Sequence, residues 1–169
     1  TTLDGDDTPI RQWLFYATMP YHEARHCEQS WLMLQGQLTG AIAMPTGPHS
    51  RGVQPTLTPD KRAELLIALG FPEAIVKRAL QSRHNFPESS IPLVRAWVDS
   101  IQGRGQASRM QVLAHLSRSP TNFNSYVNLP EEADAWAVER AVSALFRARL
   151  AAKGAGDALE GVRALFGEQ

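Results

Sequence analysis

One short segment combines the residue types that a hydrolytic metal site needs. Residues 21–27 read Tyr-His-Glu-Ala-Arg-His-Cys and contain the pattern His-Glu-x-x-His. Residues four apart on an α-helix lie on one face, one turn apart, so His22 and His26 can direct two imidazoles at one metal ion. Glu23 can then act as general base toward a metal-activated water. The pattern predicts a zinc site, and the alternative is a helix with two ordinary histidines and a surface glutamate.

A catalytic zinc site takes three protein ligands, and two glutamates further along the chain could supply the third. Glu131 and Glu132 follow Pro130 at the start of an expected helix, after a polar loop expected at 119–129. Acidic residues in a first turn also stabilise a helix through its dipole, which is a purely structural interpretation of both. Tyr126 could donate a hydrogen bond to the oxyanion formed during amide hydrolysis, or it could simply pack the loop as a half-buried aromatic.

The elements that position these residues are all expected to be helices. Apolar spacing predicts a short helix over 9–19, an interruption at Pro20, and a long motif helix over about 21–43 with a buried middle. Proline, glycine and capping residues punctuate the rest of the chain and predict further helices at 58–69, after 72, at 90–101, 107–116, 133–153 and 157–166. No convincing alternation with a period of two appears, so we expect an all-α fold.

The apolar faces of these helices are expected to point toward the core. Ala24 and Cys27 belong to the apolar stripe of the motif helix, and we interpret the thiol as a small buried side chain. Met110 and Leu145 are expected to face inward from later helices. A single cysteine also excludes an internal disulfide bond.

Length and composition are those of one globular domain. A chain of 169 residues with 43% hydrophobic residues can bury a sizeable core, so we expect a single compact domain over 1–169 with a flexible segment at 1–8. A formal net charge of zero argues against a nucleic-acid partner. No stretch approaches the ~20 apolar residues of a membrane span. The chain begins with Thr, and we expect it to be a piece of a longer protein.

Two patches of the chain resemble a known family. Tyr-His-Glu-Ala-Arg-His at 21–26 and Leu-Pro-Glu-Glu-x-Asp-Ala at 129–135 resemble zinc metallopeptidases of the gluzincin type. In that family the third ligand is a glutamate in a downstream helix, in patterns such as Glu-x-Glu-Ala-Asp. The patches are also similar to the compact metallopeptidase domains at the C-terminal tips of bacterial secreted toxins, including type VI secretion spike proteins.

The resemblance implies an enzyme with a zincin-like, all-α fold and its motif on a long buried helix. It implies one zinc per chain, bound by His22, His26 and Glu132, and amide hydrolysis with Glu23 as general base. A protein or peptide substrate, a cognate immunity protein, and secretion from a bacterium into a target cell follow from the same likeness. Two other functions stay open: a non-catalytic helical binding or adaptor module, and a zinc amidase that acts on cell-wall peptides.

The choice between the two glutamates depends on which argument is followed. Aligning Glu-x-Asp-Ala with the family's Glu-x-Glu-Ala makes Glu132 the third ligand, but position 136 is Trp where the fuller pattern has Asp. Helical spacing instead places Glu131 on the inward face of its helix, and Asp134 would then support a histidine ligand. We favour Glu132.

Overall fold

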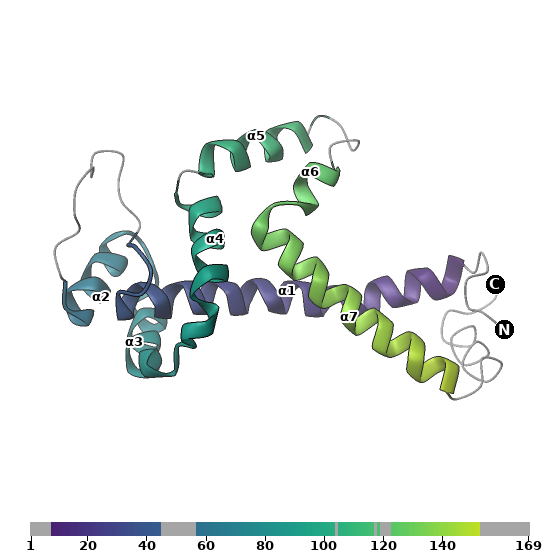
Figure 1. Cartoon of the computed structure of the whole chain (residues 1–169), viewed down its shortest axis with the longest axis horizontal. Coiled ribbons are helices and arrows are strands. Elements are labelled where there is room, and N and C mark those ends of the chain that lie inside the picture. The colour runs from purple at the N-terminus through teal and green to yellow at the C-terminus, as the bar shows by residue number, and fades with distance from the viewer. Residues whose placement is uncertain (1–7, 45–56, 104, 117, 119–122, 153–169) are drawn as a thin grey trace. The chain divides into compact units, whose positions relative to one another are not determined.

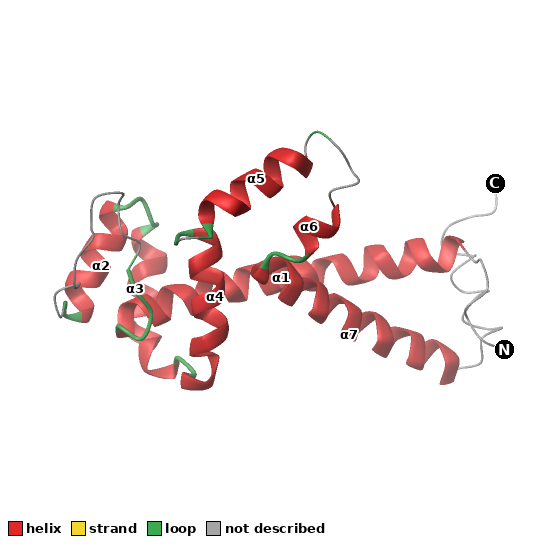
Figure 2. Ribbon diagram, turned by 45° about the horizontal axis from the view of Figure 1, so that its top comes forward, coloured by secondary structure: helices red, strands yellow, loops and turns green. Residues whose placement is uncertain are grey.

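The computed structural model describes residues 8–44, 57–103, 105–116, 118 and 123–152, and helices dominate them (Figure 1). These residues form seven α-helices and two 3-10 helices and contain no β-strand (Figure 2), so the predicted all-α class is confirmed. The elements are α1 (Thr8–Thr39), α2 (Pro59–Ala68), α3 (Glu73–Ser82), η1 (Arg83–Asn85), η2 (Glu88–Ser90), α4 (Ile91–Ile101), α5 (Gln106–Leu116), α6 (Phe123–Val127) and α7 (Pro130–Ala152).

Two of the expected segments lie outside the described residues: residues 1–7 of the expected flexible segment, and the expected helix at 157–166. Within the described part of the chain, every helix is too short or too polar to cross a lipid bilayer.

The motif lies on α1, which is one continuous helix of 32 residues. The predicted interruption at Pro20 was therefore wrong. Proline lacks the N–H that would bond to the carbonyl four residues earlier, and its ring crowds that carbonyl. Pro20 and Tyr16 are both exposed, so water can solvate the carbonyl that loses its bond. The continuous helix joins residues before Pro20 directly to the motif turn.

The C-terminal end of α1 is set by a glycine rather than by the end of the apolar pattern. Gly40 has a φ of +83°, a left-handed conformation that glycine adopts without a steric penalty. The N–H of Ile42 then returns to the carbonyl of Gly36, at 2.9 Å. Arg62 donates from Nη1 to the carbonyl of Gln37, at 3.2 Å. The helix therefore ends at Thr39, short of the predicted end at about 43.

The chain divides into two compact units, which are described separately. One comprises Thr1–Arg25 with Asp134–Gln169, and the other comprises His26–Ala133. In the second unit, the C-terminal half of α1 is surrounded by two apolar clusters. Their buried members are Leu34, Leu38, Met44, Ala63, Leu66, Val76 and Ala79 in one, and Met33, Ile42, Phe86, Val94 and Trp97 in the other. The predicted burial in the middle of the motif helix is confirmed.

The buried face of α1 around the motif is polar, and this overturns part of the prediction. Ala24 and Cys27 are exposed, so the interpretation of the cysteine as a small buried side chain was wrong. The motif turn is correspondingly less buried than predicted. The buried positions there are Thr18, His22 and Gln29, all of which have polar partners described below. An apolar pattern cannot identify a buried face whose side chains are polar.

Two further side chains expected in the core lie at the surface. Met110 is 56% exposed on α5, which packs against α4 and α6 and buries none of its residues within the described part of the chain. Leu145 is 64% exposed on α7. The stretch at 119–129, expected to be a loop, contains the short helix α6, in which the rings of Phe123 and Tyr126 lie 6.0 Å apart.

Candidate metal centre

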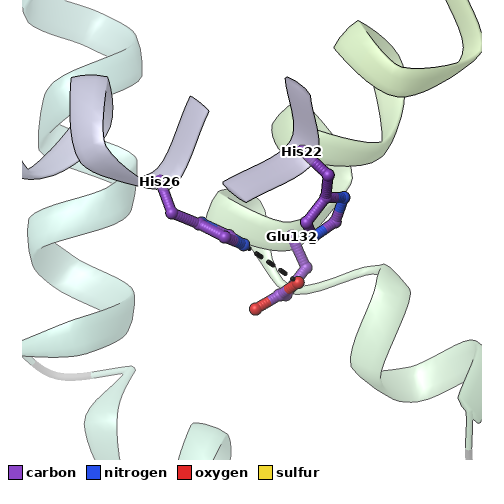
Figure 3. Close-up of side chains that lie close together, drawn as sticks. All are labelled: His22, His26 and Glu132. Atoms are coloured by element: carbon purple, nitrogen blue, oxygen red, sulfur yellow. Dashed lines mark ion pairs between the residues drawn. The ribbon is translucent and has the colours of Figure 1, made fainter. Parts of the chain in front are cut away.

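The structure brings the three predicted ligands together. His22 and His26 lie one turn apart on α1, and Glu132 lies in the first turn of α7 (Figure 3). Each offers one ligand atom, an imidazole nitrogen or a carboxylate oxygen, and these three atoms lie within 4.8 Å of one another. Within the cluster, His26 Nε2 lies 3.5 Å from Glu132 Oε2.

These distances and donor types fit zinc. Tetrahedral bonds of about 2.0–2.1 Å place neighbouring ligand atoms roughly 3.4 Å apart, close to the 3.5 Å between His26 and Glu132. Small side-chain rotations would close the wider separations. The Glu132 side chain is only 7% exposed, and a buried carboxylate needs compensation by hydrogen bonds or opposite charge. Two imidazoles and a carboxylate form an established catalytic zinc set that leaves a fourth position open.

A buried glutamine orients the second histidine. The amide Nε2 of Gln29 donates to the backbone carbonyl of Glu131, at 2.8 Å, which assigns its Oε1 as the acceptor. That oxygen lies 2.9 Å from Nδ1 of His26, so Nδ1 carries the proton in this hydrogen bond. The neutral ring then has its lone pair on Nε2, the nitrogen that faces Glu132. Gln29 is 2% exposed, so water does not compete effectively for these bonds.

A carboxylate that the sequence analysis did not identify faces the first histidine. Nδ1 of His22 lies 3.3 Å from Oε2 of Glu139, and both side chains are almost fully buried. The ring of Trp136 meets the His22 ring edge-on, with centroids 4.9 Å apart. Glu139 lies seven residues after Glu132, two helical turns along the same face of α7, and this spacing is the signal that could have revealed it.

The rival third ligand has a different partner. Oε1 of Glu131 accepts from Nε of Arg109 at 2.6 Å, and its side chain is 3% exposed. Asp134, expected to support a histidine if Glu131 were the ligand, instead accepts two hydrogen bonds from Arg25, at 2.7 and 3.2 Å. Both acidic groups are therefore engaged by arginines. This arrangement favours Glu132 over Glu131 as the ligand.

The two remaining predicted residues differ in environment. Glu23 is exposed beside His22 on α1, so water can reach its side chain. Tyr126 is half-buried on α6, packed against Phe123. Its predicted role as an oxyanion donor stays a prediction, as does the role of Glu23 as general base.

Comparison of the chain with protein-family models, with curated proteins and with solved structures gave no match. The likeness to gluzincin metallopeptidases and toxin domains therefore rests on the two sequence patches alone. Zincin-likeness of the fold likewise stays a prediction.

Proposed function

We propose that this chain is a zinc-dependent metallopeptidase. The observation that carries the proposal is the convergence of one ligand atom each from His22, His26 and Glu132, within 4.8 Å. These are the residues that the His-Glu-x-x-His pattern and its downstream glutamate select from the sequence alone. Agreement between a sequence pattern and a three-dimensional donor set is stronger support than either one separately, since exposed acidic groups and histidines often lie near one another by chance.

The proposed chemistry assigns each residue a task. Zinc, when held by the two histidines and Glu132, supplies a Lewis acid that polarises an amide carbonyl and acidifies water towards a pKa of ~7. The Glu23 carboxylate takes the proton of the attacking water and passes it to the leaving amine nitrogen. The Tyr126 hydroxyl donates a hydrogen bond to the oxyanion. Glu23 follows His22 directly on α1, so the proposed base and one metal ligand are held by the same helical turn.

The proposed biological setting is that of a bacterial secreted effector with a protein or peptide substrate. It is supported by the resemblance of segments 21–26 and 129–135 to metallopeptidase domains at the tips of secreted toxins. Such an effector would act inside a target cell and be countered by a cognate immunity protein. A zinc amidase that cleaves cell-wall peptides would use the same residues on another substrate.

The test is hydrolysis by the zinc-loaded chain and by a Glu23→Gln variant. Casein and a cell-wall stem peptide serve as substrates, which separates the peptidase from the amidase. We expect Glu23→Gln to retain zinc and lose about 10²–10⁴-fold in rate, the usual contribution of a general base. Glu28→Gln makes the same chemical change at another exposed position of α1 and should cleave at the wild-type rate. A zinc-loaded wild type that cleaves neither substrate would favour the non-catalytic helical module.

A further inference from the structure

We propose that Glu139 is a positioning residue that orients His22 for the metal, an inference that rests on the proposed function. The observation behind it is the approach of Glu139 Oε2 to His22 Nδ1, at 3.3 Å, with side chains only 11% and 9% exposed. Both residues belong to the same compact unit. The sequence pattern assigns Glu139 no role.

Glu139 is itself anchored on its other oxygen. Its Oε1 lies 3.2 Å from the hydroxyl of Thr18, a residue that is 1% exposed and lies one turn before His22 on α1. Thr18 Oγ1 also lies 2.8 Å from the carbonyl of Leu14, so its single proton is shared between that carbonyl and Glu139 Oε1. One oxygen of the carboxylate thus lies beside the Thr18 hydroxyl, while the other lies beside the ring. A fixed acceptor can impose an orientation on its donor, whereas a mobile surface carboxylate cannot.

The chemistry of metal-bound histidine explains why such a partner matters. An imidazole binds a metal through one nitrogen, and its other N–H usually donates to a carboxylate or carbonyl that fixes the tautomer and makes the ligand more basic. With Nδ1 of His22 turned to Glu139, Nε2 is the nitrogen left for the metal. Nδ1 of His26 is hydrogen-bonded to Gln29, whereas Nδ1 of His22 lies at ion-pair distance from Glu139 without hydrogen-bond geometry, so a small rotation of its ring is needed before Nδ1–H can donate. Both motif histidines therefore have an oxygen acceptor close to Nδ1.

The position of Glu139 also accounts for the unexpected residue at 136. Similar metallopeptidases have Asp four residues after the ligand, and this chain has Trp136 there, packed edge-on against the His22 ring. Positions 132, 136 and 139 share one face of α7 because they are spaced by four and three. The carboxylate is displaced by one helical turn, and the ring of His22 is confined by a carboxylate and an indole together.

A simpler explanation is that Glu139 only ties α1 to α7. The pair Arg25–Asp134 already joins the same two helices within the same unit, with Nε to Oδ2 at 2.7 Å and both side chains 17% exposed. Asp134→Asn therefore provides a matched control, because it weakens a partly buried ion pair between α1 and α7 and leaves the Glu139 carboxylate in place.

The experiment measures zinc affinity by competition with a chromophoric chelator for wild type, Glu139→Ala, Glu139→Gln and Asp134→Asn. Thermal unfolding of each metal-free protein reports the structural effect. We expect zinc dissociation constants to rise about 10–100-fold in Glu139→Ala, the range found for such supporting partners. The zinc dissociation constant of Glu139→Gln should rise less, because the amide oxygen can still accept a hydrogen bond from Nδ1–H although it carries no charge. Asp134→Asn should unfold at a lower temperature yet bind zinc as tightly as wild type.

Each outcome decides between the alternatives. Wild-type affinity in both Glu139 variants overturns the inference and leaves the proposed function intact. Equal losses of affinity in Glu139→Gln and Asp134→Asn also overturn it, because the loss would then follow fold stability. If Glu139→Ala fails to fold, Glu139→Gln decides alone. A wild type that binds no zinc refutes the proposed function itself, and this result differs from those that overturn only the role of Glu139.

Discussion

Replacing Gln29 by Leu should weaken both the fold and the metal centre. The change keeps the side-chain volume roughly constant and removes two hydrogen bonds, a part-buried one to His26 Nδ1 at 2.9 Å and a buried one to the Glu131 carbonyl at 2.8 Å. A part-buried donor left without its partner costs up to ~1–3 kcal/mol, and the carbonyl costs less because helix α7 can still bond it. We expect a total of about 2–4 kcal/mol, or a fall in Tm of roughly 4–16 °C for a chain of this size.

The same change should weaken zinc binding about 10–100-fold, or ~1.4–2.7 kcal/mol, because His26 loses the partner that fixes its tautomer and ring orientation. Gln35→Leu is the matched control. Gln35 is equally buried on α1, and its Nε2 lies 3.0 Å from both the carbonyl and the hydroxyl of Ser82. It should lower Tm by a similar amount and leave the zinc dissociation constant unchanged.

Differential scanning calorimetry of the metal-free protein and chelator competition on the reconstituted protein measure the two effects. The reasoning would be refuted if Gln29→Leu bound zinc like the wild type. It would also be refuted if both leucine variants lost affinity equally, since the loss would then follow stability rather than the orientation of His26.

Two further predictions concern other parts of the chain. Gly36→Ala should destabilise the fold by ~1–3 kcal/mol, despite the better helix propensity of alanine, because a Cβ there would lie 2.5 Å from Cγ1 of Ile42; urea denaturation measures it. The Lys77 ammonium hydrogen-bonds and attracts the exposed Glu73 carboxylate and so lowers its pKa. The resulting contribution to stability is present above the pKa that Glu73 has in the unfolded chain, and it is lost as pH falls through the lower pKa of the folded state. Lys77→Ala should therefore raise the pKa of Glu73 in an NMR titration, with a smaller effect at high salt.

Helix starts and stops were readable from local chemistry. Thr58 caps α2, accepting from the N–H of Lys61 at 3.3 Å, and Gly70 follows its end with a φ of +96°. These signals depend on a few neighbouring residues, so the sequence contains them in full. Pro20 shows the limit of such rules, because the rest of α1 outweighed the local penalty of one exposed proline.

The candidate site was only partly predictable for a different reason. Both histidines and Glu132 come from pattern and spacing, which the primary sequence carries. Glu139 and Gln29 depend on which residues of α7 face which turn of α1, and an apolar pattern is silent about polar contacts on a buried face. The choice between Glu131 and Glu132 is ambiguous in the sequence for the same reason, because the ion pair between Arg109 and Glu131 is visible only in the structure.

The most direct test of the account is the zinc content of the purified, reconstituted protein and of Glu132→Gln and Glu131→Gln, a pair of isosteric changes at adjacent positions. The account predicts one zinc per wild-type chain, lost or strongly weakened in Glu132→Gln and kept in Glu131→Gln. Loss in Glu131→Gln alone would name the other glutamate as ligand and contradict the assigned site. A wild type without zinc after reconstitution would contradict the metallopeptidase proposal and leave a helical binding module.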